Sequence, residues 1–159
     1  MTQRHRRDCS FSLVEVTLAL GVAAVSLLVI FSLLPIGLQT NQRSIEQTAS
    51  ADILSAVAAD LRATPVTNPR GNATISTQFG ISIPAAGGTG TTTLFFNTTG
   101  QSATSQQSDS RYRMTVTFVS NGGGAKTATL ADLKVTWPAG APAVNAQGSA
   151  EMFAAFDRN

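Results

Sequence analysis

The side chains most often used in enzyme chemistry are scarce in this chain of 159 residues and lie at one end of it. The only Cys, Cys9, and the only His, His5, both fall within the first ten residues. The rest of the chain therefore offers no disulfide, no Cys/His zinc site, no Ser-His-Asp triad and no Cys-His dyad. Carboxylates alone remain for catalysis, so we expect no enzyme, no metal ion and no cofactor.

One acidic side chain, Glu15, stands at the start of a long apolar segment. From Val16 to Leu34 there are 19 residues without a charge, which is long enough for a membrane-spanning helix. A carboxylate at membrane depth is costly and usually has a partner, so Glu15 is a candidate functional residue. The alternative interpretation is that Glu15 lies at the membrane–water interface.

The net charge of +2 comes from the first ten residues alone. Three arginines and one acid lie there, and the remaining basic and acidic residues balance each other. The positive-inside tendency predicts that residues 1–10 face the cytoplasm and that the body lies on the periplasmic or extracellular side. A neutral body also argues against nucleic acid as a partner.

The apolar segment does not read as a cleaved secretory signal. Such signals have about 7–15 apolar residues followed by a small-x-small site, whereas this run is longer and residues 39–44 (QTNQRS) offer no such site. A plain membrane anchor and an assembly segment remain as alternatives.

The junction Phe11-Ser12-Leu13-Val14-Glu15-Val16 resembles the start of type IV pilins and pseudopilins. The resemblance implies that residues 1–10 are a leader, which a membrane prepilin peptidase removes by cutting between Ser10 and Phe11. The family normally has Gly before the cut, and Ser10, also small, stands there in this chain. It further implies that the new amine of Phe11 is methylated.

The same resemblance gives Glu15 a role, because it matches the acid that is fifth in the mature pilin chain. Glu15 would pair with the amine of Phe11 in its own or a neighbouring subunit and set the axial register of packed helices, since an isolated charge in hydrocarbon is unfavourable. Pro35, 24 residues after Phe11, predicts a helix kink, as in related pilins. The alternative at Pro35 is a helix break at the membrane surface.

A narrower resemblance covers residues 33–65. The motif Leu34-Pro35-x-Gly37-Leu38, followed by an amphipathic helix that ends in Asp60-Leu61, is similar to the prepilin-like Verru_Chthon cassette protein B family. This family adds no mechanism beyond that of the pilin class.

Residues 39–63 predict an amphipathic continuation of the helix, ending before Pro65. The apolar stripe recurs every four residues, at Ile45, Ala49, Ile53, Val57 and Leu61, and is widened by Leu54 and Ala58. Polar residues take the other positions: Gln42, Glu46, Asp52, Asp60 and Arg62.

Residues 64–159 are rich in Thr, Ser, Gly and Ala and predict an antiparallel sheet. The candidate strands are Ala73–Ile83, Thr92–Asn97, Arg111–Ser120 and Ala128–Trp137, with a short final strand Glu151–Phe156 that uses Met152, Phe153 and Phe156. Apolar and polar residues alternate in the third and fourth strands, and the turn residues 121–124 between them predict a hairpin. Two low-complexity loops are expected, at 84–92 and 98–110; the Gly-rich first one lacks the spacing of a phosphate-binding loop.

These observations predict an α+β fold of the pilin type, in which a long N-terminal helix packs on a C-terminal antiparallel sheet. The segments are a leader (1–10), a transmembrane or filament-core helix (11–38), its amphipathic continuation (39–63) and a β-rich domain (64–159). The expected function is that of a minor pilin or pseudopilin in a type IV pilus-like or type II secretion-like filament. Its implied partners are other subunits, the prepilin peptidase, an assembly platform with its ATPase, and the inner membrane. The alternative is an uncleaved, membrane-anchored periplasmic binding module.

Overall fold

The computed structural model describes residues 12–64, 74–84, 88–120 and 128–156 of the chain. The chain divides into two compact units, Met1–Ser44 and Ile45–Asn159. Its elements are one long helix and antiparallel strands, so the predicted α+β class is confirmed. Ser10 and Phe11 lie outside the described residues, so cleavage between them and methylation of Phe11 remain predictions.

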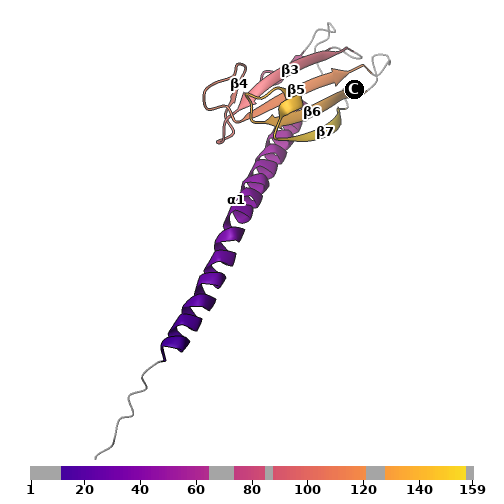
Figure 1. The fold of residues 1–159 in the computed structure, drawn as a ribbon. Coiled ribbons are helices and arrows are strands. Elements are labelled where there is room, and N and C mark those ends of the chain that lie inside the picture. The colour runs from indigo at the N-terminus through magenta and orange to yellow at the C-terminus, as the bar shows by residue number, and fades with distance from the viewer. Residues whose placement is uncertain (1–11, 65–73, 85–87, 121–127, 157–159) are drawn as a thin grey trace, which may run out of the picture. The chain divides into compact units, whose positions relative to one another are not determined.

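The helix α1 runs from Leu13 to Ala63 (Figure 1). Its 51 residues correspond to a length of about 77 Å at 1.5 Å per residue. The predicted C-terminus, just before Pro65, agrees with the structure to within one residue. The helix continues through Pro35, so the alternative of a helix break at that position is wrong, whereas the kink remains a prediction.

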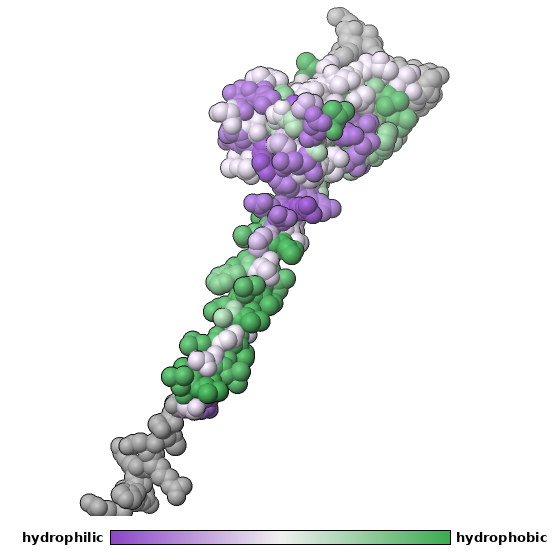
Figure 2. Space-filling model, in the orientation of Figure 1, coloured by the Kyte–Doolittle hydropathy of each residue, from purple (hydrophilic) through white to green (hydrophobic). Residues whose placement is uncertain are grey.

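The N-terminal part of α1 exposes apolar side chains along its whole length. Every residue from Leu13 to Ile45 is exposed, and Figure 2 shows hydrophobic residues gathered along this part of the helix. The hydroxyls within it donate to carbonyls of their own helix; Thr17 bonds Val14 and Ser26 bonds Val22. Among the described residues, α1 is the one helix that is long and apolar enough to cross a membrane.

The second unit contains a five-stranded antiparallel sheet with the order β4-β3-β5-β6-β7 (Figure 1). The strands are β3 (Gly90–Phe96), β4 (Ser102–Ala103), β5 (Tyr112–Val119), β6 (Thr129–Trp137) and β7 (Gly148–Phe156). The hairpin predicted between the third and fourth candidate strands is confirmed as the β5–β6 pair, in which Val116 lies opposite Leu133. A short 3-10 helix, Ala143–Asn145, precedes β7. The strands β1 (Thr74–Ile75) and β2 (Ser82–Ile83) form a separate two-stranded sheet.

The core of this unit lies between the last turns of α1 and the inner face of the sheet. Helix residues Ile53, Val57 and Leu61 belong to one buried cluster with the alternate residues of β5 and β6. The residues of the five-stranded sheet in this cluster are Leu94, Phe96, Tyr112, Met114, Val116, Phe118, Ala131, Leu133, Val135, Trp137, Ala154 and Phe156. Burial of each large apolar side chain contributes roughly 1.5–3 kcal/mol, which makes this layer the main source of the unit's stability.

Two sequence predictions were wrong in detail. Ile45 was assigned to the buried stripe but is 58% exposed, because burial of the helix begins only near Ala49. Candidate strand 73–83 is interrupted by a turn in which Gly80 has a φ of +66°, a conformation that extended strands do not adopt. The predicted final strand Glu151–Phe156 is confirmed as part of β7, in which the alternation of faces turns Phe153 to the outer face of the sheet, where it is 71% exposed.

The loop predicted at 98–110 also contains an unpredicted strand. Strand β4, only two residues long, pairs with Phe95 and Phe96 of β3. Its sequence, Ser-Ala, carries no β-strand signal, so tertiary pairing rather than local propensity creates it. The turn residues 121–124 of the predicted hairpin lie outside the described residues.

Gly148, opposite Trp137 in the β6–β7 pair, is a position where only hydrogen fits. A Cβ atom there would lie 2.3 Å from Cζ2 of Trp137. We expect Gly148→Ala to destabilise the protein by about 1–3 kcal/mol through overpacking. The measurement is urea unfolding of the detergent-solubilised full chain, followed by the fluorescence of Trp137, the single tryptophan.

The matched control is Gly90→Ala in β3, whose added Cβ would meet Phe118 at an ordinary 4.0 Å. An equal loss of stability in the two variants would contradict the steric explanation.

Candidate functional site

Glu15 lies in the first turn of α1, where the helix dipole favours a negative charge. Its backbone N–H donates to the carbonyl of Ser12 at 2.9 Å, and its side chain is exposed. No other charged residue lies between Leu13 and Gln42 in the sequence. Glu15 is therefore an isolated carboxylate on an otherwise uncharged stretch of helix.

A shallow hollow lies beside this carboxylate on one face of α1. It is lined by Glu15, Val16, Ala19, Leu20 and Ala23, which recur at helical spacing. The small side chains of Ala19 and Ala23, one and two turns beyond Glu15, leave room for another helix to approach closely. This shallow groove on α1 therefore leaves room for a second helix and carries a single negative charge at its N-terminal end.

Pro35 is exposed within α1, and the structure does not bring it near Glu15. The two residues are separated by 20 positions, or about 30 Å along the helix axis. Glu15 and Pro35 are therefore independent features, and no site is formed by both.

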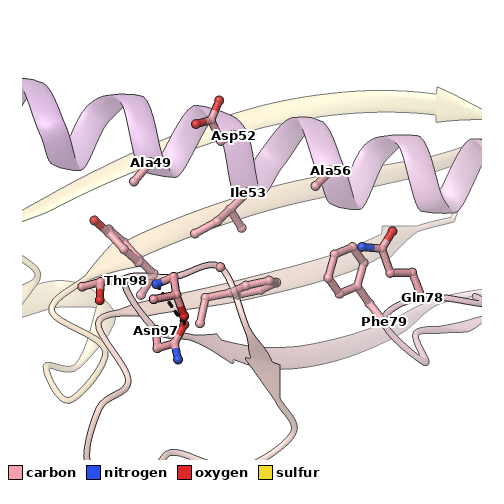
Figure 3. A pocket seen from close by; sticks show the side chains of 12 residues that line it. Ala49, Asp52, Ile53, Ala56, Gln78, Phe79, Asn97 and Thr98 are labelled. Atoms are coloured by element: carbon pink, nitrogen blue, oxygen red, sulfur yellow. Dashed lines mark hydrogen bonds between the residues drawn. The ribbon is translucent and has the colours of Figure 1, made fainter.

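The second unit contains a pocket of about 330 Å³ (Figure 3). Ala49, Ile53 and Ala56 of α1 point toward its aromatic side chains, whereas the carboxylate of Asp52 points away. The aromatic part of the lining is Phe79, Phe96 and Tyr112, and Gln78 and residues 97–100 complete it. The rings of Phe79 and Phe96 meet edge to face, with centroids 5.6 Å apart. The lining therefore combines aromatic and small apolar side chains with a few polar groups, a composition found in small-molecule sites.

Asn97 organises a loop that lines this pocket. Its Oδ1 accepts hydrogen bonds from the backbone N–H groups of Thr99 and Gln101, at 3.1 and 2.9 Å. Its Nδ2 donates to the carboxylate of Asp109 at 3.1 Å, which closes the loop. The sequence placed Asn97 at the end of the candidate strand Thr92–Asn97 and gave it no role in the loop, although Asn before Thr-Thr-Gly is a turn signal.

Asp60 holds the segment of Gln78 and Phe79, which lines the pocket. Its two carboxylate oxygens accept the backbone N–H groups of Gln78 and Phe79, at 3.0 and 3.1 Å. Asp60 was predicted on the polar side of the helix but is only 6% exposed, which corrects that assignment. The signal lay in its spacing, because Asp60 follows Ile53 by seven positions and Val57 by three, on the core-facing side.

An ion pair joins α1 to the sheet near Tyr112. Arg111 pairs with Glu46, a residue that the sequence placed on the polar side of the helix. Burial, followed by the nearby Glu46 carboxylate, raises the pKa of the Tyr112 phenol, and Arg111 opposes this effect.

Comparison with protein-family models, with curated proteins and with solved structures found no match for this chain. The pilin resemblance therefore rests on the residues Phe11–Val16 and on the order of elements, and it stays a prediction. Within the described residues, no three His, Cys, Asp or Glu side chains gather as metal ligands.

We expect Asp60→Ala to destabilise the protein by about 1–3 kcal/mol, because two backbone N–H groups in the β1–β2 turn lose their acceptor. Asp52 is exposed and lies on another face of α1, so Asp52→Ala should change the free energy of unfolding by less than about 0.5 kcal/mol. Urea unfolding of both variants measures the difference. Equal stabilities would show that the carboxylate does not hold the turn.

Asp132 predicts a dependence of stability on pH. Its Oδ1 atom is buried without a hydrogen-bond partner in the described part of the chain. Burial and the neighbouring Glu151 raise the pKa of Asp132 above 3.8, and Lys134 opposes them. The folded state holds the proton of Asp132 more tightly than the unfolded state does. The stability that this group contributes is therefore fully present below its unfolded-state pKa. It is then lost as the pH rises through the folded-state pKa.

Asp132→Asn cannot ionise, so the urea midpoint of the unmodified protein should fall relative to that of this variant between about pH 3 and pH 7. The measurement is the difference between the two midpoints at each pH. A difference that stays constant across this range would contradict the expectation.

Proposed function

We propose that this chain is a structural subunit of a type IV pilus-like or type II secretion-like filament, as a minor pilin or pseudopilin. After removal of residues 1–10, its N-terminal helix packs with those of other subunits, and its α+β unit covers the outside. Before assembly, the helix holds the subunit in the inner membrane, with the α+β unit on the periplasmic side.

The observation that carries the proposal is the division of one continuous helix into two environments. From Leu13 to Ile45 every side chain is exposed, and the stretch up to Leu38 is overwhelmingly apolar. From Ile53 to Leu61 the same helix contributes a buried stripe to an antiparallel sheet. The exposed stretch also carries one carboxylate, Glu15, beside a shallow groove with the small residues Ala19 and Ala23.

The groove supports assembly through helix–helix packing. Small residues allow close approach in an apolar medium, and a carboxylate there needs a positive partner. The amine of a cleaved Phe11, four residues before Glu15, has the required charge. The prepilin peptidase that creates this amine, an assembly platform and its ATPase complete the proposed set of partners.

One observation favours the second candidate, an uncleaved membrane-anchored binding module. The pocket of about 330 Å³ is within the size range of ligand sites and is lined in part by aromatic side chains. In that case the helix would be only a tether, and Glu15 would lie at the membrane surface without a partner.

We expect Glu15→Ala to reduce incorporation into the filament fraction by at least about tenfold. Loss of a buried ion pair costs more than about 1.4 kcal/mol, which corresponds to a tenfold change in an equilibrium constant. Membrane insertion should be unchanged, because the substitution makes the helix more apolar. The measurement is co-isolation of the variant with a tagged unmodified copy from the native host, alongside its amount in the membrane fraction.

Thr17→Ala is the matched control, since the Thr17 hydroxyl is exposed and bonds only to its own helix. It should incorporate normally. Normal incorporation of Glu15→Ala would remove the basis for the register role and favour the tether.

A further inference from the structure

The charged residues that flank the apolar part of α1 are spaced to match a lipid bilayer. Glu15 is the first charge in this helix and Arg43 is the next, 28 positions later. Because α1 is continuous from Leu13 to Ala63, these positions correspond to about 42 Å along the helix axis. A bilayer is about 40–45 Å thick including its headgroup layers. The span between the two charges therefore matches one complete bilayer.

The apolar stretch Val16–Leu38 is centred on Leu27. It is bounded by Glu15 on one side and Gln39 on the other, each twelve positions from Leu27, and Figure 2 shows hydrophilic residues at both ends of the hydrophobic part. Twelve positions correspond to about 18 Å, whereas the hydrocarbon extends about 15 Å from the bilayer midplane. A helix tilt of about 20° shortens the 18 Å only to about 17 Å. With Leu27 at the midplane, both bounding residues thus lie outside the hydrocarbon.

The hydroxyl groups inside this stretch do not require a different depth. Thr17, Ser26 and Ser32 donate hydrogen bonds to carbonyls of their own helix, at 2.9, 2.8 and 2.7 Å. A hydroxyl that is bonded in this way does not need water. The position of α1 in a bilayer is therefore governed by its apolar length and by the charges at the two ends.

The start of α1 also belongs in a polar layer. A helix leaves its first backbone N–H groups without an acceptor of its own. In α1 the N–H groups of Glu15 and Val16 donate to the carbonyl of Ser12, at 2.9 and 3.2 Å, whereas those of Leu13 and Val14 precede these bonds. Unbonded N–H groups are costly in hydrocarbon, and water or headgroup oxygens can accept from them. The backbone therefore favours the same depth for this end as the carboxylate does.

A deeper position of Glu15 would expose apolar side chains at the other end of the stretch. If Glu15 lay about 5 Å inside the hydrocarbon, the far boundary of the hydrocarbon would fall near Ser32. Leu33, Leu34 and Ile36 would then lie among the headgroups, and an unpaired carboxylate would lie in hydrocarbon. Both effects oppose the deeper register.

We propose that, in the membrane, α1 takes the register in which Glu15 and Arg43 lie in opposite headgroup layers of a phospholipid bilayer. The inference rests on the proposed storage of the subunit in the membrane and fixes the depth of the carboxylate there. At this depth Glu15 is hydrated and needs no ion partner. The need for an amine arises only when α1 leaves the bilayer and this end of the helix packs among other helices.

The test is the rate at which a water-soluble maleimide alkylates single cysteines in the full chain, in a Cys9→Ser background that leaves no other thiol. The protein is reconstituted in nanodiscs of dioleoyl phosphatidylcholine, in which both bilayer surfaces are open to solvent. The variants are Val14→Cys, Leu27→Cys and Ile36→Cys, all at exposed apolar positions of α1. Only the thiolate reacts, and burial in hydrocarbon suppresses this charged form, so the rate reports depth.

With Glu15 in the headgroup layer, Val14 lies about 20 Å and Ile36 about 14 Å from the midplane. We therefore expect Val14→Cys to react at least about tenfold faster than Leu27→Cys, and Ile36→Cys to react as slowly as Leu27→Cys. Slow reaction of Val14→Cys, or fast reaction of Ile36→Cys, would contradict this register and overturn the inference while the filament proposal stood. Fast reaction at all three positions would show that α1 does not span the bilayer, and the proposed membrane storage would fall as well.

Discussion

Between Leu13 and Leu38, α1 turns sixteen large apolar side chains outward. Transfer of each from water to an apolar medium is favourable by roughly 1.5–3 kcal/mol, so together they represent on the order of tens of kcal/mol. This exceeds the typical net stability of about 5–15 kcal/mol for a folded domain. Under the proposed function, the need to bury this helix in an apolar medium is therefore the main constraint on the protein.

The single carboxylate at the start of this helix narrows the choice of medium. Lipid alone would leave Glu15 without a partner, whereas a bundle of helices with free amines at the same depth would satisfy it. The hydroxyl groups of Thr17 and Ser26 need no partner from outside the helix, because they donate hydrogen bonds to carbonyls of their own helix. The proposed helix packing would account for both the groove at Ala19 and Ala23 and the charge of Glu15.

Patterns that repeat could be predicted from the sequence, and features that depend on tertiary contact could not. The alternation of Met114, Val116 and Phe118 gave the core strand correctly, because a period of two follows from strand geometry. Strand β4 could not be predicted, because its pairing with β3 depends on a turn organised by Asn97. Gly80 could be recognised as a turn residue, but only the structure shows that it divides the predicted strand.

The candidate site was predicted to a different extent in each unit. Glu15 and the apolar helix could be recognised from the sequence, because residue charge and hydropathy do not depend on the fold. The pocket was not, since Ile53, Phe79 and Tyr112 come from distant segments that only folding brings together. Asp60 lay on the buried side of the helix by its spacing, but its acceptor role required the position of the β1–β2 turn. Exposed Phe153 needed the register of β7, which no sequence signal provides.

The most direct measurement is the intact mass and N-terminal sequence of the protein extracted from membranes of its native host. Assembly through α1 requires the amine that pairs with Glu15, and this amine exists only after cleavage. We therefore predict a chain that begins at Phe11 and carries a methyl group on its amine. A chain that begins at Met1 or Thr2 would contradict the account and leave α1 as a tether.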